Sequence, residues 1–255
     1  MGRDIEIALR RLAPSSAVGW LIVINIVVFI SLKLLMLSGI RSSMLELPAG
    51  LAPLASRPWS LVTYMFTQYD VWHILFNMLL LYWFGQLYLT LGTERRIFML
   101  YLFGGIAGAV AFELCHSFGA PIYGNLVGAS SSVLAIVITT AVMMPDFKIG
   151  LLLIGEVAIK WIAIAIVILD ILGVSGGNLG GHAAHLGGII AGVVAGVMFR
   201  HPLLFRSRRQ KASIYNDNNE AELDEILDKI RRSGYNSLTS SERRRLFDVS
   251  KKIKR

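Results

Sequence analysis

The chain has 255 residues, of which 55% are apolar and only 16% are charged, and its formal net charge is +8. A soluble domain carries about 25% charged residues, so this composition excludes an ordinary soluble protein and indicates an integral membrane protein. Residues 200–255 hold 15 of the 25 Lys and Arg residues and +7 of the net charge. A basic segment beside a membrane span is typical of a cytoplasmic face, so we expect no nucleic-acid binding. The single cysteine excludes an internal disulfide framework.

Six apolar segments follow a short N-terminal arm at residues 1–15. In chain order they are Val18–Leu37, Trp72–Leu91, Ile97–Phe118, Ser130–Met144, Val157–Val174 and His182–Phe199. About 20 residues are needed to cross the hydrocarbon core, so the fourth segment is too short to reach both surfaces. We therefore expect it to begin below one surface, with Ser130 inside the plane of the membrane.

The Lys and Arg residues between these segments predict their orientation. Arg95, Arg96, Lys148 and Lys160 lie in every second connection, whereas the third-to-fourth and fifth-to-sixth connections contain no Lys or Arg. The positive-inside rule then places both termini in the cytoplasm. The arm lacks the apolar region of a signal peptide, so we expect the first span to be retained. The predicted fold is an all-α membrane protein with six transmembrane helices at residues 16–199.

The chain changes character after the sixth segment. Residues 200–219 form a basic linker, and residues 220–255 form a small helical appendage with apolar side chains at helical spacing. Gly234 is placed to end a first helix, and Thr239–Glu242 reads as a capping box that opens a second. We expect a cytoplasmic helical hairpin that serves docking or regulation. A solvated tail with marginal helices is an equally compatible interpretation.

Ser130 is the first candidate for chemistry because it stands where a glycine-containing loop meets a predicted helix. Gly128 allows a tight turn there, and the amides and dipole of a helix start stabilise negative charge. A serine at a helix start is also an ordinary N-terminal cap. Ser131 and Ser132 are competing candidates for a nucleophile.

His185 is the candidate base because it begins a stripe of small residues on the sixth segment. Gly188, Gly192 and Gly196 follow it at four-residue spacing, which lets two membrane helices approach closely. A histidine at one end of such a seam can reach the start of the neighbouring helix and form a Ser–His dyad. In the alternative reading the stripe only packs helices and His185 faces a polar loop. His182 is a rival base.

His73 and Asn77 lie four residues apart on the second segment and therefore share a helical face. Each carries an N–H donor, so together with the Ser130 amide they would complete an oxyanion hole. The simpler interpretation is an interhelical hydrogen bond that joins two spans.

A metal site is a further possibility, because His182, His185 and His73 are all potential zinc ligands. No His-Glu-x-x-His motif and no neighbouring acidic ligand is present, so we expect no metal and no cofactor. The two remaining carboxylates within the segments, Glu113 and Asp170, fall near the outer ends, where side chains reach water. We therefore expect no carboxylate as a third catalytic member.

Together these residues resemble the motifs of rhomboid intramembrane serine proteases, over residues 16–199 and in the expected order. The matching motifs are His73-Ile-Leu-Phe-Asn77, Gly128-Ala-Ser130-Ser and Ala184-His185-Leu-Gly-Gly188-Ile-Ile-Ala-Gly192. The resemblance implies Ser130 as nucleophile, His185 as base, and His73, Asn77 and the Ser130 amide as oxyanion donors. It also implies that substrates are transmembrane helices cleaved near their outer end.

Several positions depart from the family pattern. Ser131 follows the nucleophile where many relatives carry glycine, and Leu134 replaces an aromatic residue that often packs on the base. Gln68 stands where many relatives carry another histidine, and the first loop, Ser38–Val71, matches poorly in sequence. The Leu134 substitution leaves open which group orients His185. The tail resembles a short hairpin at the ends of some bacterial rhomboids.

The sequence thus predicts an intramembrane serine endopeptidase that works through a Ser130–His185 dyad and an acyl-enzyme. The main alternative is a catalytically inactive rhomboid-like module that binds membrane proteins, and a small transporter or channel is a third. Expected partners are transmembrane substrates and the lipid bilayer, and a bacterial inner membrane is the expected location. The substrate, the cleavage sequence and the oligomeric state are left open.

Overall fold

The computed structural model describes residues 16–40, 43–151, 155–173 and 177–200, and in the tail residues 226, 228–232, 237–242 and 246. The chain falls into two compact units, Met1–His201 and Pro202–Arg255. The predicted N-terminal arm at 1–15, the linker after Arg200 and most of the 220–255 appendage lie outside the described residues, so those domain boundaries stay predictions.

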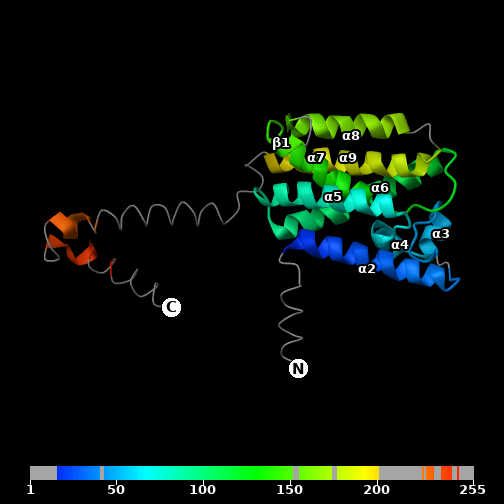
Figure 1. The fold of residues 1–255 in the computed structure, drawn as a ribbon, viewed down its shortest axis with the longest axis horizontal. Helices are drawn as coiled ribbons and strands as arrows, with labels where there is room; N and C mark the ends of the chain where they lie inside the picture. Colours follow the sequence, from blue (N-terminus) through cyan, green and yellow to red (C-terminus); the bar gives the residue numbers. More distant parts are fainter. Residues whose placement is uncertain are drawn as a thin grey trace, which may run out of the picture. The chain divides into compact units, whose positions relative to one another are not determined.

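Helices that run side by side form the first unit (Figure 1). The long helices are α2 (Ala17–Leu37), α5 (Val71–Leu89), α6 (Glu94–Ser117), α7 (Ser130–Met143), α8 (Ile159–Gly173) and α9 (Leu179–Arg200). Each of the predicted apolar segments overlaps one of them. Between α2 and α5 the chain forms α3 (Leu51–Ser56), α4 (Ser60–Thr63) and the 3₁₀ turn η1 (Tyr64–Phe66).

A short antiparallel hairpin joins α7 to α8. Its strands are β1 (Lys148–Leu151) and β2 (Gly155–Ala158), with Lys148 opposite Ala158. The expectation that the fifth span begins at Val157 is therefore wrong at its first two residues. Gly155 has a φ of +89°, a conformation suited to glycine, and it starts the returning strand there.

Side-chain caps fix the starts of three helices. Ser16, Asp70 and Thr93 accept hydrogen bonds from the amides of Gly19, His73 and Arg96, in α2, α5 and α6 respectively. The Glu94 carboxylate, in the first turn of α6, accepts a hydrogen bond from the Ala17 amide and so joins the starts of α2 and α6.

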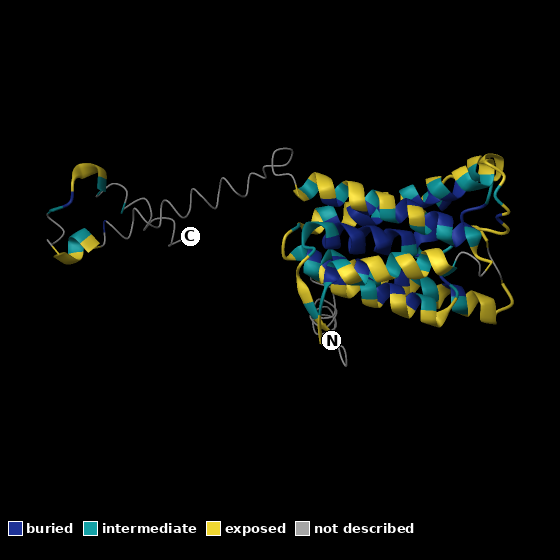
Figure 2. Cartoon of the chain, turned by 90° about the horizontal axis from the view of Figure 1, so that it is seen from above, coloured by how far each residue is buried: buried dark blue, intermediate teal, exposed yellow. Residues whose placement is uncertain are grey.

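Among the described residues, α2, α6 and α9 are long and apolar enough to cross a membrane, and α7 is a shorter apolar helix. Large apolar side chains on the outer helices are exposed, including Trp20, Trp72, Phe103 and Leu169. Figure 2 shows these exposed residues surrounding a buried centre. An apolar surface of this extent is expected to face lipid. The prediction of exactly six spans stays a prediction.

Helix α7 forms the buried centre, with every residue from Ser131 to Ala141 buried. Glycines on its neighbours make this possible. A Cβ atom on Gly188 would lie 2.2 Å from the Ser131 carbonyl oxygen, and one on Gly192 would lie 2.8 Å from the Ala135 oxygen. The predicted close approach along the glycine stripe is therefore confirmed, with α9 packed on α7.

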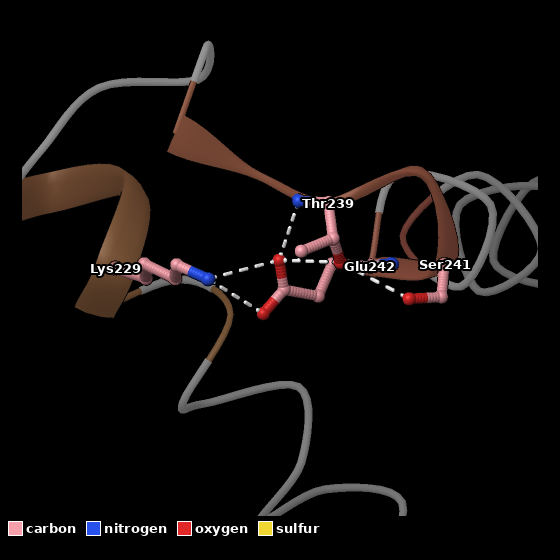
Figure 3. Close-up of polar contacts among 4 residues, drawn as sticks. All are labelled: Lys229, Thr239, Ser241 and Glu242. Carbon is pink, nitrogen blue, oxygen red and sulfur yellow. Dashed lines mark hydrogen bonds and ion pairs between the residues drawn. The ribbon is translucent and has the colours of Figure 1, made fainter.

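The tail unit contains the predicted capping box. The Thr239 amide donates to the Glu242 carboxylate at 2.7 Å, and the Thr239 hydroxyl accepts from the Glu242 amide at 3.4 Å. Lys229, from the preceding helical segment, points at the same carboxylate and bonds both of its oxygens, at 2.9 and 3.1 Å (Figure 3). A complete hairpin around this contact stays a prediction.

Candidate active site

The structure brings Ser130 and His185 into direct contact. Ser130 is the first residue of α7, and His185 lies in the second turn of α9. The Ser130 Oγ atom lies 2.7 Å from Nε2 of His185. The cap position of α7 belongs to Ala129, and the helix has no side-chain cap there. The Ser130 hydroxyl thus pairs with an imidazole and does not act as an ordinary helix cap.

A carboxylate completes the contact on the other side of the imidazole. Nδ1 of His185 lies 2.5 Å from Oδ1 of Asp170, in the last turn of α8. The Asp170 side chain is only 12% exposed. The expectation that Asp170 reaches water is therefore wrong, and a carboxylate, contrary to expectation, lies where a third member would lie. The end of α8 lies beside the start of α9, and a half-buried carboxylate there gains more from imidazole partners than from partial hydration.

His182 shares the same carboxylate. Its Nδ1 atom lies 2.7 Å from Oδ1 of Asp170, and its ring stands edge-on to that of His185, with centroids 5.8 Å apart. The ring also packs closely on Gly173, where an added Cβ would lie 2.9 Å from its Cε1 atom. The rival base therefore flanks Asp170, while His185 is the histidine paired with the serine.

These three residues also offer metal-ligand atoms within 4.8 Å of one another. The two observed N–O distances, 2.5 and 2.7 Å, are those of hydrogen bonds. Ligand atoms of a tetrahedral zinc ion lie about 3.3 Å apart, given zinc–ligand bonds of about 2.0–2.1 Å. The arrangement of Asp170, His182 and His185 therefore fits shared protons better than a bound metal.

The competing serines have different surroundings. The Ser131 hydroxyl lies 3.0 Å from the Tyr64 hydroxyl, which itself donates to the Gly105 carbonyl at 2.6 Å. The Ser132 hydroxyl is buried with no hydrogen-bond partner among the described residues. Of these three serines, Ser130 is the one that the described structure pairs with a histidine.

His73 lies beside Gly128, on the side of the turn that leads to Ser130. That glycine has a φ of +121°, and an added Cβ would lie 2.9 Å from Cε1 of His73 and 3.8 Å from the Ser130 Oγ. The His73 ring and the Ser130 hydroxyl therefore both lie close to Gly128. A side chain at position 128 would be strained and would displace the histidine.

Asn77 lies deeper on the same helix and belongs to a buried hydrogen-bonded chain. Its Nδ2 donates to Oε1 of Gln68 at 2.9 Å, and Nε2 of Gln68 donates to Oδ1 of Asn25 at 3.0 Å. Asn25 in turn donates to the Tyr101 hydroxyl at 3.0 Å, and that hydroxyl donates to the Met65 carbonyl at 3.0 Å. This chain connects the predicted oxyanion donor to α2 and α6.

The sequence did not reveal this chain, which we call the amide ladder (Asn77, Gln68, Asn25 and Tyr101). All four side chains are at most 5% exposed. Gln68, which departs from the family pattern, lies at the centre of the ladder between Asn25 and Asn77. An asparagine in an otherwise apolar span, such as Asn25, was the available signal.

The loop before α7 is braced by the loop between α2 and α5. Leu47 and Leu126 exchange two main-chain hydrogen bonds, of 3.0 and 2.8 Å, and the Gly128 amide donates to the Tyr64 carbonyl at 3.0 Å. Glu113 supports the same loop by accepting from the Gly50 amide at 3.0 Å. Glu113 is only 6% exposed, so the expectation that it reaches water is also wrong.

Leu134, the position expected to leave the base without an aromatic neighbour, is buried in α7. The bond between Asp170 and Nδ1 fixes the ring of His185 instead, because it sets both orientation and tautomer. The group that orients the His185 ring is therefore Asp170, on α8.

The comparisons with known proteins agree with this architecture. The rhomboid domain family matches residues 55–202. The chain belongs to the rhomboid family. Residues 211–252 of this rhomboid protein match a family of unknown function, DUF6576. The chain is 30% identical over 160 residues to the zebrafish (Danio rerio) presenilin-associated rhomboid-like protein A, mitochondrial.

That alignment covers 60% of this chain and 40% of the zebrafish protein, so the chain matches well under half of that relative's length. The match and the apolar helices establish an integral membrane protein of a family that acts on transmembrane substrates within the bilayer.

Proposed function

We propose that this rhomboid protein is an intramembrane serine endopeptidase that cleaves transmembrane helices near their outer ends. The observation that carries the proposal is the 2.7 Å contact between the Ser130 Oγ and His185 Nε2, with Asp170 bound to the opposite ring nitrogen. A hydroxyl, a base and an orienting carboxylate in this order form the arrangement that activates a serine.

In the first half-reaction the Ser130 oxygen attacks the scissile carbonyl carbon while its proton passes to Nε2 of His185. The Asp170 carboxylate stabilises the imidazolium that forms. Collapse of the tetrahedral intermediate breaks the C–N bond, and Nε2 gives its proton to the leaving amine. Water then repeats the sequence on the acyl-enzyme, with His185 again as base and then as acid.

The developing oxyanion needs donors that are already in place. The Ser130 amide lies in the first turn of α7, where amide groups have no partner within the helix and the dipole is positive. The ring of His73 flanks the same point, and Asn77 has a second amide N–H besides the one given to Gln68. These three donors are assigned to the oxyanion hole.

The membrane arrangement is part of the proposal. Six spans with both termini cytoplasmic follow from the positions of the Lys and Arg residues. Residues 16–199 are assigned to the membrane domain, residues 200–219 to a linker, and residues 220–255 to a cytoplasmic helical appendage. The zebrafish relative is named as mitochondrial, which gives no support to the expected bacterial inner membrane.

A fluorophosphonate probe separates the protease from a catalytically inactive binding module. The purified protein in detergent is expected to be labelled covalently, and Ser130→Ala is expected to abolish labelling. The matched controls are Ser131→Ala and Ser132→Ala, which remove neighbouring hydroxyls from the same helix turn and should keep labelling. Labelling that survives Ser130→Ala contradicts the assignment of the nucleophile. A folded protein that is never labelled and cuts no tagged single-span substrate is the binding module.

A further inference from the structure

A cavity lies in the half of the bundle away from Ser130. It has a volume of about 430 Å³, within the range of small-molecule sites, and lies between α7, α8 and α9. These helices are neighbours in the bundle (Figure 1). Its apolar walls include Ile138, Val142, Ile164, Val167, Ile189 and Val193. We call this cavity the inner groove.

The inner groove is remote from the catalytic candidates. Val142 stands twelve residues after Ser130 on α7, which corresponds to about 18 Å along a helix. Ile164 and Val193 are 45% and 42% exposed, so the groove opens toward the outer surface of the bundle. In a bilayer that opening faces lipid, and hydrocarbon is the solvent that fills it.

Two cations stand at one end of the groove. Lys160, near the start of α8, and Arg200, the last residue of α9, are both lining residues. Asp146 accepts a hydrogen bond from Nζ of Lys160 at 2.6 Å. That bond, with the charges of Lys160 and Arg200, holds the pKa of the Asp146 carboxyl below its usual range. Two positive charges and one negative charge therefore lie at this end of the groove, which we call its mouth.

The nearby hairpin does not balance this charge. Lys148 and Glu156, on β1 and β2, pair with each other at 3.5 Å and cancel. Counted over the described residues, the mouth of the groove keeps one net positive charge beside an apolar channel. A basic pocket between membrane helices at the cytoplasmic surface is the arrangement that binds anionic lipid headgroups.

We propose that the inner groove binds one anionic phospholipid, with an acyl chain between α8 and α9 and the phosphate on Lys160 and Arg200. The apolar walls of the groove bind the acyl chain, and the two cations at its mouth bind the phosphate. A zwitterionic lipid has no net charge to balance the mouth, and free phosphate has no chain to fill the walls. The site does not depend on catalysis by Ser130.

The test uses the full chain purified in a neutral detergent. Native mass spectrometry measures the lipid retained from titrations with phosphatidylglycerol and with phosphatidylcholine of the same acyl chains. We expect one tightly retained phosphatidylglycerol and no equivalent phosphatidylcholine. Each cation near a lipid headgroup contributes about a fivefold change in affinity, so Lys160→Gln with Arg200→Gln should weaken retention about 25-fold.

Two further variants separate the groove from general surface charge. Arg95→Gln removes an exposed cation at the start of α6, outside the groove, and should leave retention unchanged. Val167→Trp keeps both cations but fills the channel, and should weaken retention of phosphatidylglycerol at least tenfold. Thermal unfolding in the same detergent confirms that each variant is folded, and Arg200→Gln alone replaces the double variant if the latter unfolds.

Four results would overturn the proposal. The first three are equal retention of phosphatidylcholine, unchanged retention in the folded Lys160 and Arg200 variants, and equal loss in Arg95→Gln. The fourth is retention that survives Val167→Trp, which would place the lipid on the surface charge alone.

Discussion

Helices α7 and α8 contribute to the same candidate active site but are held in opposite ways. In α7 every residue from Ser131 to Ala141 is buried, and glycines of α6 and α9 contact its backbone. In α8 only Ile159 and Ala163 are buried. Ser130 is therefore positioned by dense packing, whereas Asp170 is held near α9 mainly by its two imidazole partners. The comparison separates residues that position the site through packing from one that does so through hydrogen bonds.

The largest expected effect comes from the weakly packed side of this comparison. Asp170→Asn removes the charge that stabilises the imidazolium and permits the wrong tautomer of His185. Turnover is expected to fall by up to about 10⁴-fold, the loss seen when a triad loses its orienting carboxylate. The unfolding midpoint should change little because α8 has few buried residues. Probe labelling rates and thermal unfolding measure the two effects separately.

His182→Ala is the control for Asp170→Asn. It removes the second imidazole but keeps the 2.5 Å contact between Asp170 and His185. Its turnover should fall far less than that of Asp170→Asn. Equal losses in the two variants would contradict the assignment of the orienting role to the carboxylate.

The densely packed side is tested by Gly188→Val. A Cβ there meets the Ser131 carbonyl oxygen at 2.2 Å, and a backbone atom moves only if the helices separate. Overpacking of this kind is expected to cost about 3 kcal/mol or more of unfolding free energy. Leu169→Ala, at a side chain of α8 that is 68% exposed, should stay within about 0.5 kcal/mol. Similar unfolding midpoints for both variants would refute the contrast between the helices.

Breaking the amide ladder at Asn25, on α2, is expected to lower the free energy of unfolding by a smaller amount. Asn25→Leu removes the partner of Gln68 Nε2 and one partner of the Tyr101 hydroxyl, both of which stay buried. Leaving such groups unsatisfied costs about 1–3 kcal/mol. Ile26→Ala changes the next residue, which is 41% exposed, and should be nearly neutral. Denaturant titration in detergent compares the two, and a neutral Asn25→Leu would show that the ladder does not support the fold.

The smallest effect is expected in the tail unit, at the contact of the Glu242 carboxylate with Lys229 and Thr239. The hydrogen bonds from Lys229 and Thr239 lower the pKa of Glu242 from 4.5 to about 2. Because the folded pKa is depressed, the contact stabilises the tail fully above about pH 4.5 and loses this effect as the pH falls toward 2. The Thr239 amide resonance of the full chain should shift over that range.

Glu242→Gln is the control for the tail. It keeps the side-chain length but removes the titrating carboxyl, so the Thr239 amide should no longer shift between pH 4.5 and 2. A shift that persists in Glu242→Gln would assign the titration to another group.

Much of this architecture can be predicted from the sequence because long runs of apolar residues indicate membrane helices directly. The predicted segments and the observed helices differ by at most three residues at any end. The glycine stripe from Gly188 to Gly196 predicted a close helix contact because small residues at that spacing let two helices approach closely. Ser130 and His185 were found because polar groups are costly in such segments.

The residues that were misread are those whose partners lie on another helix. Asp170 and Glu113 were assigned to water from their depth alone, although their partners, His185 and Gly50, lie on other segments. For Asp170 a signal was present, since it ends one segment and His182 and His185 begin the next. No comparable signal joins Gln68 to Asn25, which are 43 residues apart.

The contact between Leu47 and Leu126 also bears on which substitutions the first loop can accept. Both of its hydrogen bonds run between main-chain atoms, as does the bond from Gly128 to Tyr64. Such pairing places almost no demand on side-chain identity. Substitutions can therefore accumulate across this loop while the turn that presents the serine keeps its shape.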